Sequence, residues 1–139
     1  MELNVNFIFR GIDFTPIKVN LDYNLVFTEM SEVGDSISHR ADRTMDYGYA
    51  SIQYEIKPNE FSNHFELNLS RIKTAFDHLT QLGLQEILVY ISFGYESQFN
   101  WEFTPHELKQ LSELNITLNI SAYKVSTLGG QSIPSAKTD

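Results

Sequence analysis

The chain contains no cysteine, and this absence excludes disulfide bonds, thiolate nucleophiles, iron–sulfur clusters and zinc sites built on cysteine. It also lacks the run of about eighteen apolar residues that a membrane-spanning helix requires. The first residues, Met1 to Asn4, do not show the basic and then apolar order of a secretion signal. We therefore expect a cytoplasmic protein.

Basic residues are scarce. The 139 residues include 10 Lys and Arg against 18 Asp and Glu, which gives a formal net charge of −8. Nucleic-acid backbones and anionic bilayers both select clustered Lys and Arg, so this composition argues against either partner. With 42% hydrophobic residues the chain suits one core. We expect a single globular domain over residues 1–125 and a flexible C-terminal tail over residues 126–139.

Four segments have the patterns of strands. Apolar and polar residues alternate over 3–10 and 116–121, and the segment 47–56 is rich in aromatic and β-branched residues. The segment 84–93 is apolar at odd and even positions alike, which is typical of a strand in the middle of a sheet. Between residues 26 and 46 the periodicity fades, and we expect a solvent-facing connection rich in loops.

Three segments have the patterns of helices. Apolar residues recur every three or four positions over 61–82, and Gly83 follows, which predicts a long amphipathic helix. Thr104-Pro105-His106-Glu107 matches a capping box and predicts a second helix start. Thr15-Pro16 predicts a short helix over about 16–23. The residues expected to share its apolar face are Ile17, Leu21 and Leu25.

The resulting order, β-α-(loop)-β-α-β-(β)-α-β, predicts an α+β fold with an antiparallel or mixed sheet and helices packed on one face. The nearest simple precedent is the β-α-β-β-α-β ferredoxin-like wrap, of which we expect a variant. The strand in parentheses covers 93–103, where aromatic residues at odd positions predict a one-sided aromatic ribbon. These residues are Phe93, Tyr95, Phe99, Trp101 and Phe103.

Motifs for catalysis or metal binding are missing from the sequence. His64 lies one helical turn after Glu60, but a metal site needs three or more protein ligands, so a solvated pair is expected. His78 near a helix end and His106 inside the capping box are explained by helix geometry. No nucleophile elbow, phosphate-binding glycine loop or metalloprotease motif occurs. We expect no catalytic residue, cofactor or metal.

The segment His39 to Arg43 leaves an alternative open, because it combines an imidazole, a carboxylate and two guanidinium groups that clamp carboxylates or phosphates. A small-ligand-binding or enzymatic domain would use His39, Arg40 and Arg43. A solvated salt-bridge patch explains the same residues. A third alternative is a structural subunit that self-associates through the last strand, if that strand lies at an open edge. We expect a monomer or a weak homodimer.

Acidic residues dominate the segment from Glu86 to Glu113, where five glutamates accompany a single lysine. Aromatic residues lie between them, and aromatic anchors within a charged rim are typical of protein interfaces. The competing interpretation is that the aromatic row packs beneath a helix while the glutamates face water. An acidic surface attracts basic partners and raises their association rate, so a cationic protein is the expected partner.

Several short motifs carry a family resemblance. They are Gly11-Ile12-Asp13-Phe14-Thr15-Pro16, the Gly34-Asp35 turn, and Phe103-Thr104-Pro105 followed by Leu108, Leu111, Leu114 and Tyr123. Over about residues 3–125 the chain resembles a bacterial family of small α+β domains of unknown function. Where that family often has a tryptophan, this chain has Tyr47 and Tyr49. Some members of the family lie beside polymorphic or contact-dependent toxins and resemble immunity proteins.

The resemblance implies an immunity protein that binds and neutralises a cognate basic toxin domain, with a nuclease as the expected class. Such a protein would have no activity of its own. The expected contact residues combine the acids of 29–46 with the aromatic and acidic segment 95–102. They are Glu29, Glu32, Asp35, Asp42, Asp46, Tyr95, Glu96, Phe99, Trp101 and Glu102.

Overall fold

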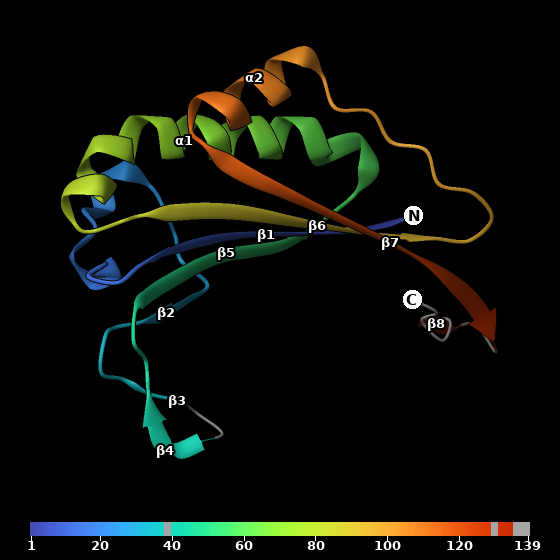
Figure 1. Cartoon of the computed structure of the whole chain (residues 1–139). Coiled ribbons are helices and arrows are strands. Elements are labelled where there is room, and N and C mark those ends of the chain that lie inside the picture. The colour runs from blue at the N-terminus through green and yellow to red at the C-terminus, as the bar shows by residue number, and fades with distance from the viewer. Residues whose placement is uncertain (38–39, 129–130, 135–139) are drawn as a thin grey trace.

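The computed structural model describes residues 1–37, 40–128 and 131–134, and its main feature is a mixed sheet with helices on one face (Figure 1). β6 and β7 are parallel, whereas the other neighbouring strands of the sheet are antiparallel. The predicted α+β class with a mixed sheet is therefore confirmed. In spatial order the strands are β2 (Glu29–Ser31), β5 (Gly48–Ile56), β1 (Glu2–Gly11), β6 (Glu86–Tyr95), β7 (Ile116–Leu128) and β8 (Gln131–Pro134).

Two helices, α1 (Phe61–Gln81) and α2 (Pro105–Glu113), lie over the same face of the sheet (Figure 1). α1 connects β5 to β6, which run parallel on either side of β1, and α2 connects β6 to its neighbour β7. This arrangement varies the ferredoxin-like wrap, because the described residues between β1 and β5 form no α-helix and because β6 and β7 form a parallel pair.

The core lies between these helices and the covered face of the sheet. Aromatic rings fill its centre, where Phe7 stacks on Phe65 at a centroid distance of 5.6 Å and Phe65 stacks on Phe61 at 4.9 Å. Burial of one such ring contributes about 1.5–3 kcal/mol, and a one-residue slip of β1 would expose its whole apolar set. Those β1 residues are Leu3, Val5, Phe7 and Phe9, each at most 1% exposed.

The prediction of a helix over 16–23 is wrong. The chain forms two short 3-10 helices instead, η1 (Pro16–Lys18) and η2 (Leu21–Tyr23), with extended backbone at the residues between them. The Asn20 side chain accepts a hydrogen bond from the Asp22 N–H at 3.0 Å, and Asn24 takes a left-handed φ of 59°. Short polar side chains of this kind compete with helical hydrogen bonds, which explains the interruption.

A close backbone approach holds the segment after β1 in place. Gly83, predicted as the end of the long helix, has φ of 98°, and a Cβ at this position would lie 2.5 Å from the Asp13 carbonyl oxygen. Across the same contact the Thr15 N–H donates to the Leu82 carbonyl at 3.0 Å. Only glycine fits here, and the contact fixes where η1 lies.

The connection from 26 to 46 contains three short strands. β2 pairs with β5, while β3 (Ser36–Ile37) and β4 (Arg40–Thr44) pair with each other and project away from the main sheet (Figure 1). We call residues 29–46 the acidic arm. Its acids are Glu29, Glu32, Asp35, Asp42 and Asp46.

The end of the chain is more regular than the sequence predicts. β7 continues past residue 121 to Leu128 and then pairs with β8, so part of the segment predicted as a tail forms strands. Residues 129, 130 and 135–139 of the predicted tail lie outside the described residues.

Candidate functional site

The acidic arm gathers five of the predicted contact residues at one end of the molecule. Two hydrogen bonds stabilise the turn at residues 32–35. Asp35 Oδ2 accepts from the Glu32 N–H at 2.7 Å, and the Met45 N–H donates to the Asp35 carbonyl at 2.7 Å. The side chains of Glu29, Asp42 and Asp46 are exposed. The arm therefore presents carboxylates to solvent on a fixed turn.

Three apolar side chains are exposed where the arm joins the sheet. Ile17 on η1 is 70% exposed, Met30 on β2 is 47% exposed and Val33 in the turn is 51% exposed. η1 lies against β2, and the Ile17 N–H donates to Glu32 Oε2 at 3.4 Å, so a carboxylate lies beside Ile17. We call Ile17, Met30 and Val33 the apolar root. Apolar side chains inside a charged rim suit a protein interface.

Sequence reasoning missed the apolar root. It assigned Ile17 and Leu21 to the buried face of a helix together with Leu25, but only Leu25 is buried. The two asparagines at 20 and 24 were the available signal, because short polar residues spaced inside a weak helical pattern favour turns.

The aromatic rings of the segment 95–102 pack largely against the core. Trp101 packs edge-on against Phe61 at a centroid distance of 5.1 Å and against Phe93 at 5.3 Å. Phe99 contacts Phe93 at 4.8 Å and keeps 37% of its surface exposed. β6 ends at Tyr95, and the residues from 98 to 104 form no strand, so the predicted ribbon continues only as an irregular segment. The Trp101 ring therefore has little area left for a partner.

Glu96 and Glu102 are exposed on that same segment. The connection from β6 to α2, which contains them, lies far from β3 and β4 of the acidic arm (Figure 1). Gly48, which follows the arm, pairs with Gly11 at one end of β1, whereas Leu3 at the other end pairs with Phe93 near the end of β6. Eight residues of extended strand span roughly 26 Å. The structure thus brings the predicted acids together in two groups at opposite ends of the sheet.

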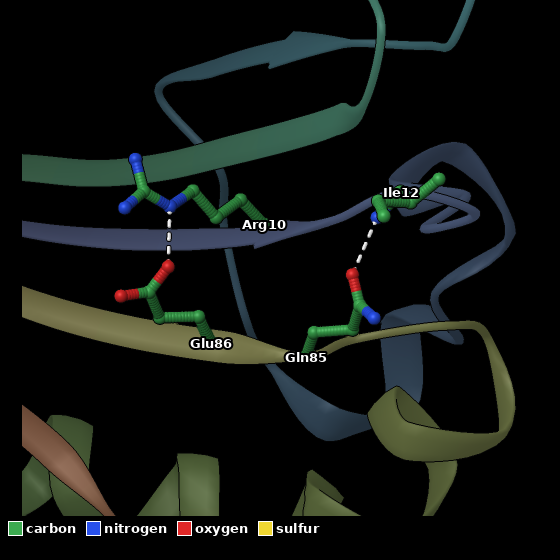
Figure 2. Close-up of polar contacts among 4 residues, drawn as sticks. All are labelled: Arg10, Ile12, Gln85 and Glu86. Carbon is green, nitrogen blue, oxygen red and sulfur yellow. Dashed lines mark hydrogen bonds and ion pairs between the residues drawn. The ribbon is translucent and has the colours of Figure 1, made fainter.

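A third charged feature lies on the face of the sheet that the helices leave open (Figure 2). Arg10 Nε donates to Glu86 Oε2 at 2.6 Å, and Gln85 Oε1 accepts from the Ile12 N–H at 2.7 Å. The hydrogen bond to Glu86 raises the pKa of Arg10 above its ordinary value. A hollow of about 240 Å³ borders the pair. Glu86 is thereby neutralised within the chain and is a poor contact for a cationic partner.

The ligand-binding alternative rests on residues that the structure describes only in part. His39 lies outside the described residues, and Arg43 is exposed on β4. Of the other histidines, His78 Nε2 accepts a hydrogen bond from the Asn20 N–H at 3.0 Å and its ring stacks on Tyr23. His78 thus holds η2 against α1, which is a structural role.

Within residues 1–37, 40–128 and 131–134, no group of three or more histidine, aspartate or glutamate side chains could hold a metal ion. In the same ranges, none of the helices has the length and apolar character needed to cross a membrane. No family model matches the chain, and the comparisons with curated proteins and with solved structures also found no match.

Proposed function

We propose that this chain is an immunity-type protein that binds and neutralises a cognate basic toxin domain, with a nuclease as the expected class. The observation that carries the proposal is the presence of exposed apolar side chains at the base of the acidic arm, together with carboxylates that form no ion pair among the described side chains. Ile17 and Met30 supply apolar area, and the Glu32 carboxylate lies beside Ile17, whose N–H donates to it. A cationic protein surface that also carries an apolar side chain is complementary to this arrangement.

Charge on the arm is favourable for such a partner. The segment from 29 to 46 contains five acidic residues and two arginines. Among the described side chains, no ion pair within 4 Å involves Glu29, Glu32 or Asp35. Exposed carboxylates at this density raise the association rate of a basic protein, and salt weakens that effect. The arm supports the proposal better than the segment 95–102, where Trp101 is already packed.

The direct test is co-expression with a candidate toxin domain, chosen from the genes that neighbour this one. The chain is expected to restore growth and to form a one-to-one complex whose affinity falls as the salt concentration rises. A toxin domain that stays active in the presence of excess chain, or a complex that is indifferent to salt, would contradict the proposal.

A matched pair of variants locates the contact surface. The arm variant combines Glu29→Gln, Asp42→Asn and Asp46→Asn. Its control combines Glu55→Gln, Glu60→Gln and Asp77→Asn, which changes the net charge equally at exposed positions outside the arm. We expect the arm variant to bind the toxin domain at least tenfold more weakly than the control, measured by calorimetry. Equal losses would show that total charge, and not the arm, determines binding.

A further inference from the structure

β7 has a long edge that no strand covers in the described part of the chain. Its inner edge pairs with β6 from Ile116 to Lys124, and on the other side β8 pairs only with Val125 to Leu128. The outer edge of residues 116–124 therefore has no strand partner among the described residues. Free N–H and C=O groups in such an edge are a template for pairing with another strand.

Among the described residues, this stretch has none of the usual protections of an edge strand. The segment 116–123, ITLNISAY, contains no proline and no charged residue, and its register with β6 shows no bulge. α2 lies against β7 and Ile116 is buried, but Ile120 is 49% exposed and Ala122 is exposed. The edge is thus free of bulges, uncharged over residues 116–123 and partly apolar.

We propose that this edge pairs with the same edge of a second copy of the chain, antiparallel and around a two-fold axis at Ile120. Self-complementary pairing of this kind is the simplest way to close an open edge, because one patch serves both copies. In this register each Ile120 lies beside the other, and Lys124 lies opposite Ile116 of the second copy.

Charge explains why a second copy fits this edge better than a cationic toxin does. The edge offers no carboxylate to a cation, and it brings no carboxylates of two acidic copies into contact. Lys124 of each copy would approach the start of β7 in the other, close to the end of α2 at Glu113. A cation is favoured at the C-terminal end of a helix.

The pairing leaves the acidic arms free. β2 and β7 lie on opposite sides of the strand order, so the two arms would point away from the shared edge. One dimer could then bind two toxin domains, and the dimer itself does not depend on the proposed toxin-binding function.

The absence of cysteine makes a crosslinking test direct. Opposed residues in an antiparallel pair have Cα atoms about 4.5–5.5 Å apart, which is within the range of a disulfide bond. Under mild oxidation Ile120→Cys is expected to form a covalent dimer at least tenfold faster than Leu67→Cys, whose parent residue is 46% exposed on α1. Equal rates for the two variants would overturn the proposal.

Sedimentation equilibrium of the unmodified chain supplies the second readout. Ile120→Lys places two like charges face to face and should weaken the dimer at least tenfold, whereas Leu67→Lys should not. Salt is expected to strengthen the dimer, because it screens the repulsion between two copies of charge −8. A wild-type chain that stays monomeric into the high micromolar range, or an Ile120→Lys variant that dimerises as tightly as wild type, would overturn the inference.

Discussion

Tyr54 is the residue whose chemistry the fold changes most clearly. It lies on the helix-covered face of β5, with its ring 5.7 Å from that of His64, and its hydroxyl has no hydrogen-bond partner of acceptable geometry in the described part of the chain. Burial raises the pKa of Tyr54 to about 12, and the neighbouring Asn68 side chain opposes a smaller part of this change. The neutral phenol is therefore strongly preferred in the folded state.

This pKa predicts a specific loss of stability in alkali. In the unfolded chain the Tyr54 phenol has a pKa of about 10, whereas in the folded chain its pKa is about 12. The stability that this difference contributes is fully present below pH 10 and is lost as the pH rises toward 12, because only the unfolded chain then releases the proton. Between these pH values wild type should lose ~2 kcal/mol more of its unfolding free energy than Tyr54→Phe. Urea denaturation at several pH values measures the difference.

Tyr90→Phe, which removes a phenol that is 42% exposed on the open face, serves as the control and should follow wild type. A Tyr54→Phe variant with the wild-type pH dependence would refute the assignment.

At the scale of elements, α2 shows how local sequence decides where a helix begins. Thr104 Oγ1 accepts a hydrogen bond from the Glu107 N–H at 3.1 Å, and the Thr104 N–H donates to Glu107 Oε1 at 2.8 Å. The predicted capping box is thus confirmed. Glu107 is fully buried, so the cap also ties the start of the helix to the core.

Removing the cap should destabilise the protein measurably. Thr104→Ala leaves a helix N–H without its acceptor and is expected to cost about 1 kcal/mol of unfolding free energy. Thr80→Ala is the matched control, because Thr80 lies in α1, is exposed, and its hydroxyl donates to the Phe76 carbonyl of its own helix. Thermal or urea unfolding of the two variants separates the effects, and equal losses would contradict a special role for the cap.

The sequence patterns predict neither a helix nor a strand in the acidic arm. Its β3–β4 hairpin pairs only with itself among the described strands, and two-stranded hairpins are marginally stable by themselves. The turn contacts of Asp35 hold its base in place. An arm of this kind exposes most of its side chains, which suits recognition more than core packing.

At the scale of the whole molecule, the net charge of −8 works against folding and in favour of binding. Like charges on one compact surface repel each other, and salt screens this repulsion. We therefore expect sodium chloride to raise the melting temperature by several degrees. Differential scanning calorimetry at low and moderate salt tests this expectation. A melting temperature that falls with salt would instead show that attractive pairs such as Arg10 with Glu86 dominate.

Much of the fold could be predicted from short-range patterns. The alternation in β1, the apolar spacing of α1 with Gly83 behind it, and the capping box at Thr104 each reflect constraints within a few residues. The prediction of a helix over 16–23 was wrong because it followed the helical spacing of Ile17 and Leu21. The local turns at Asn20 and Asn24 interrupt that helix in the structure.

For the candidate site, the sequence predicted which kinds of residue take part but not where they lie. The sequence by itself determined that the chain is acidic and free of cysteine. It also determined that the chain forms amphipathic strands and helices, because burying one face of a strand or helix requires apolar residues at a period of about 2 or 3.6. Only the tertiary structure decided that the two acidic groups lie at opposite ends, that Trp101 packs inward and that no described strand covers the outer edge of β7 from Ile116 to Lys124. These outcomes depend on which distant strands pair and in what register, and no local pattern encodes that choice.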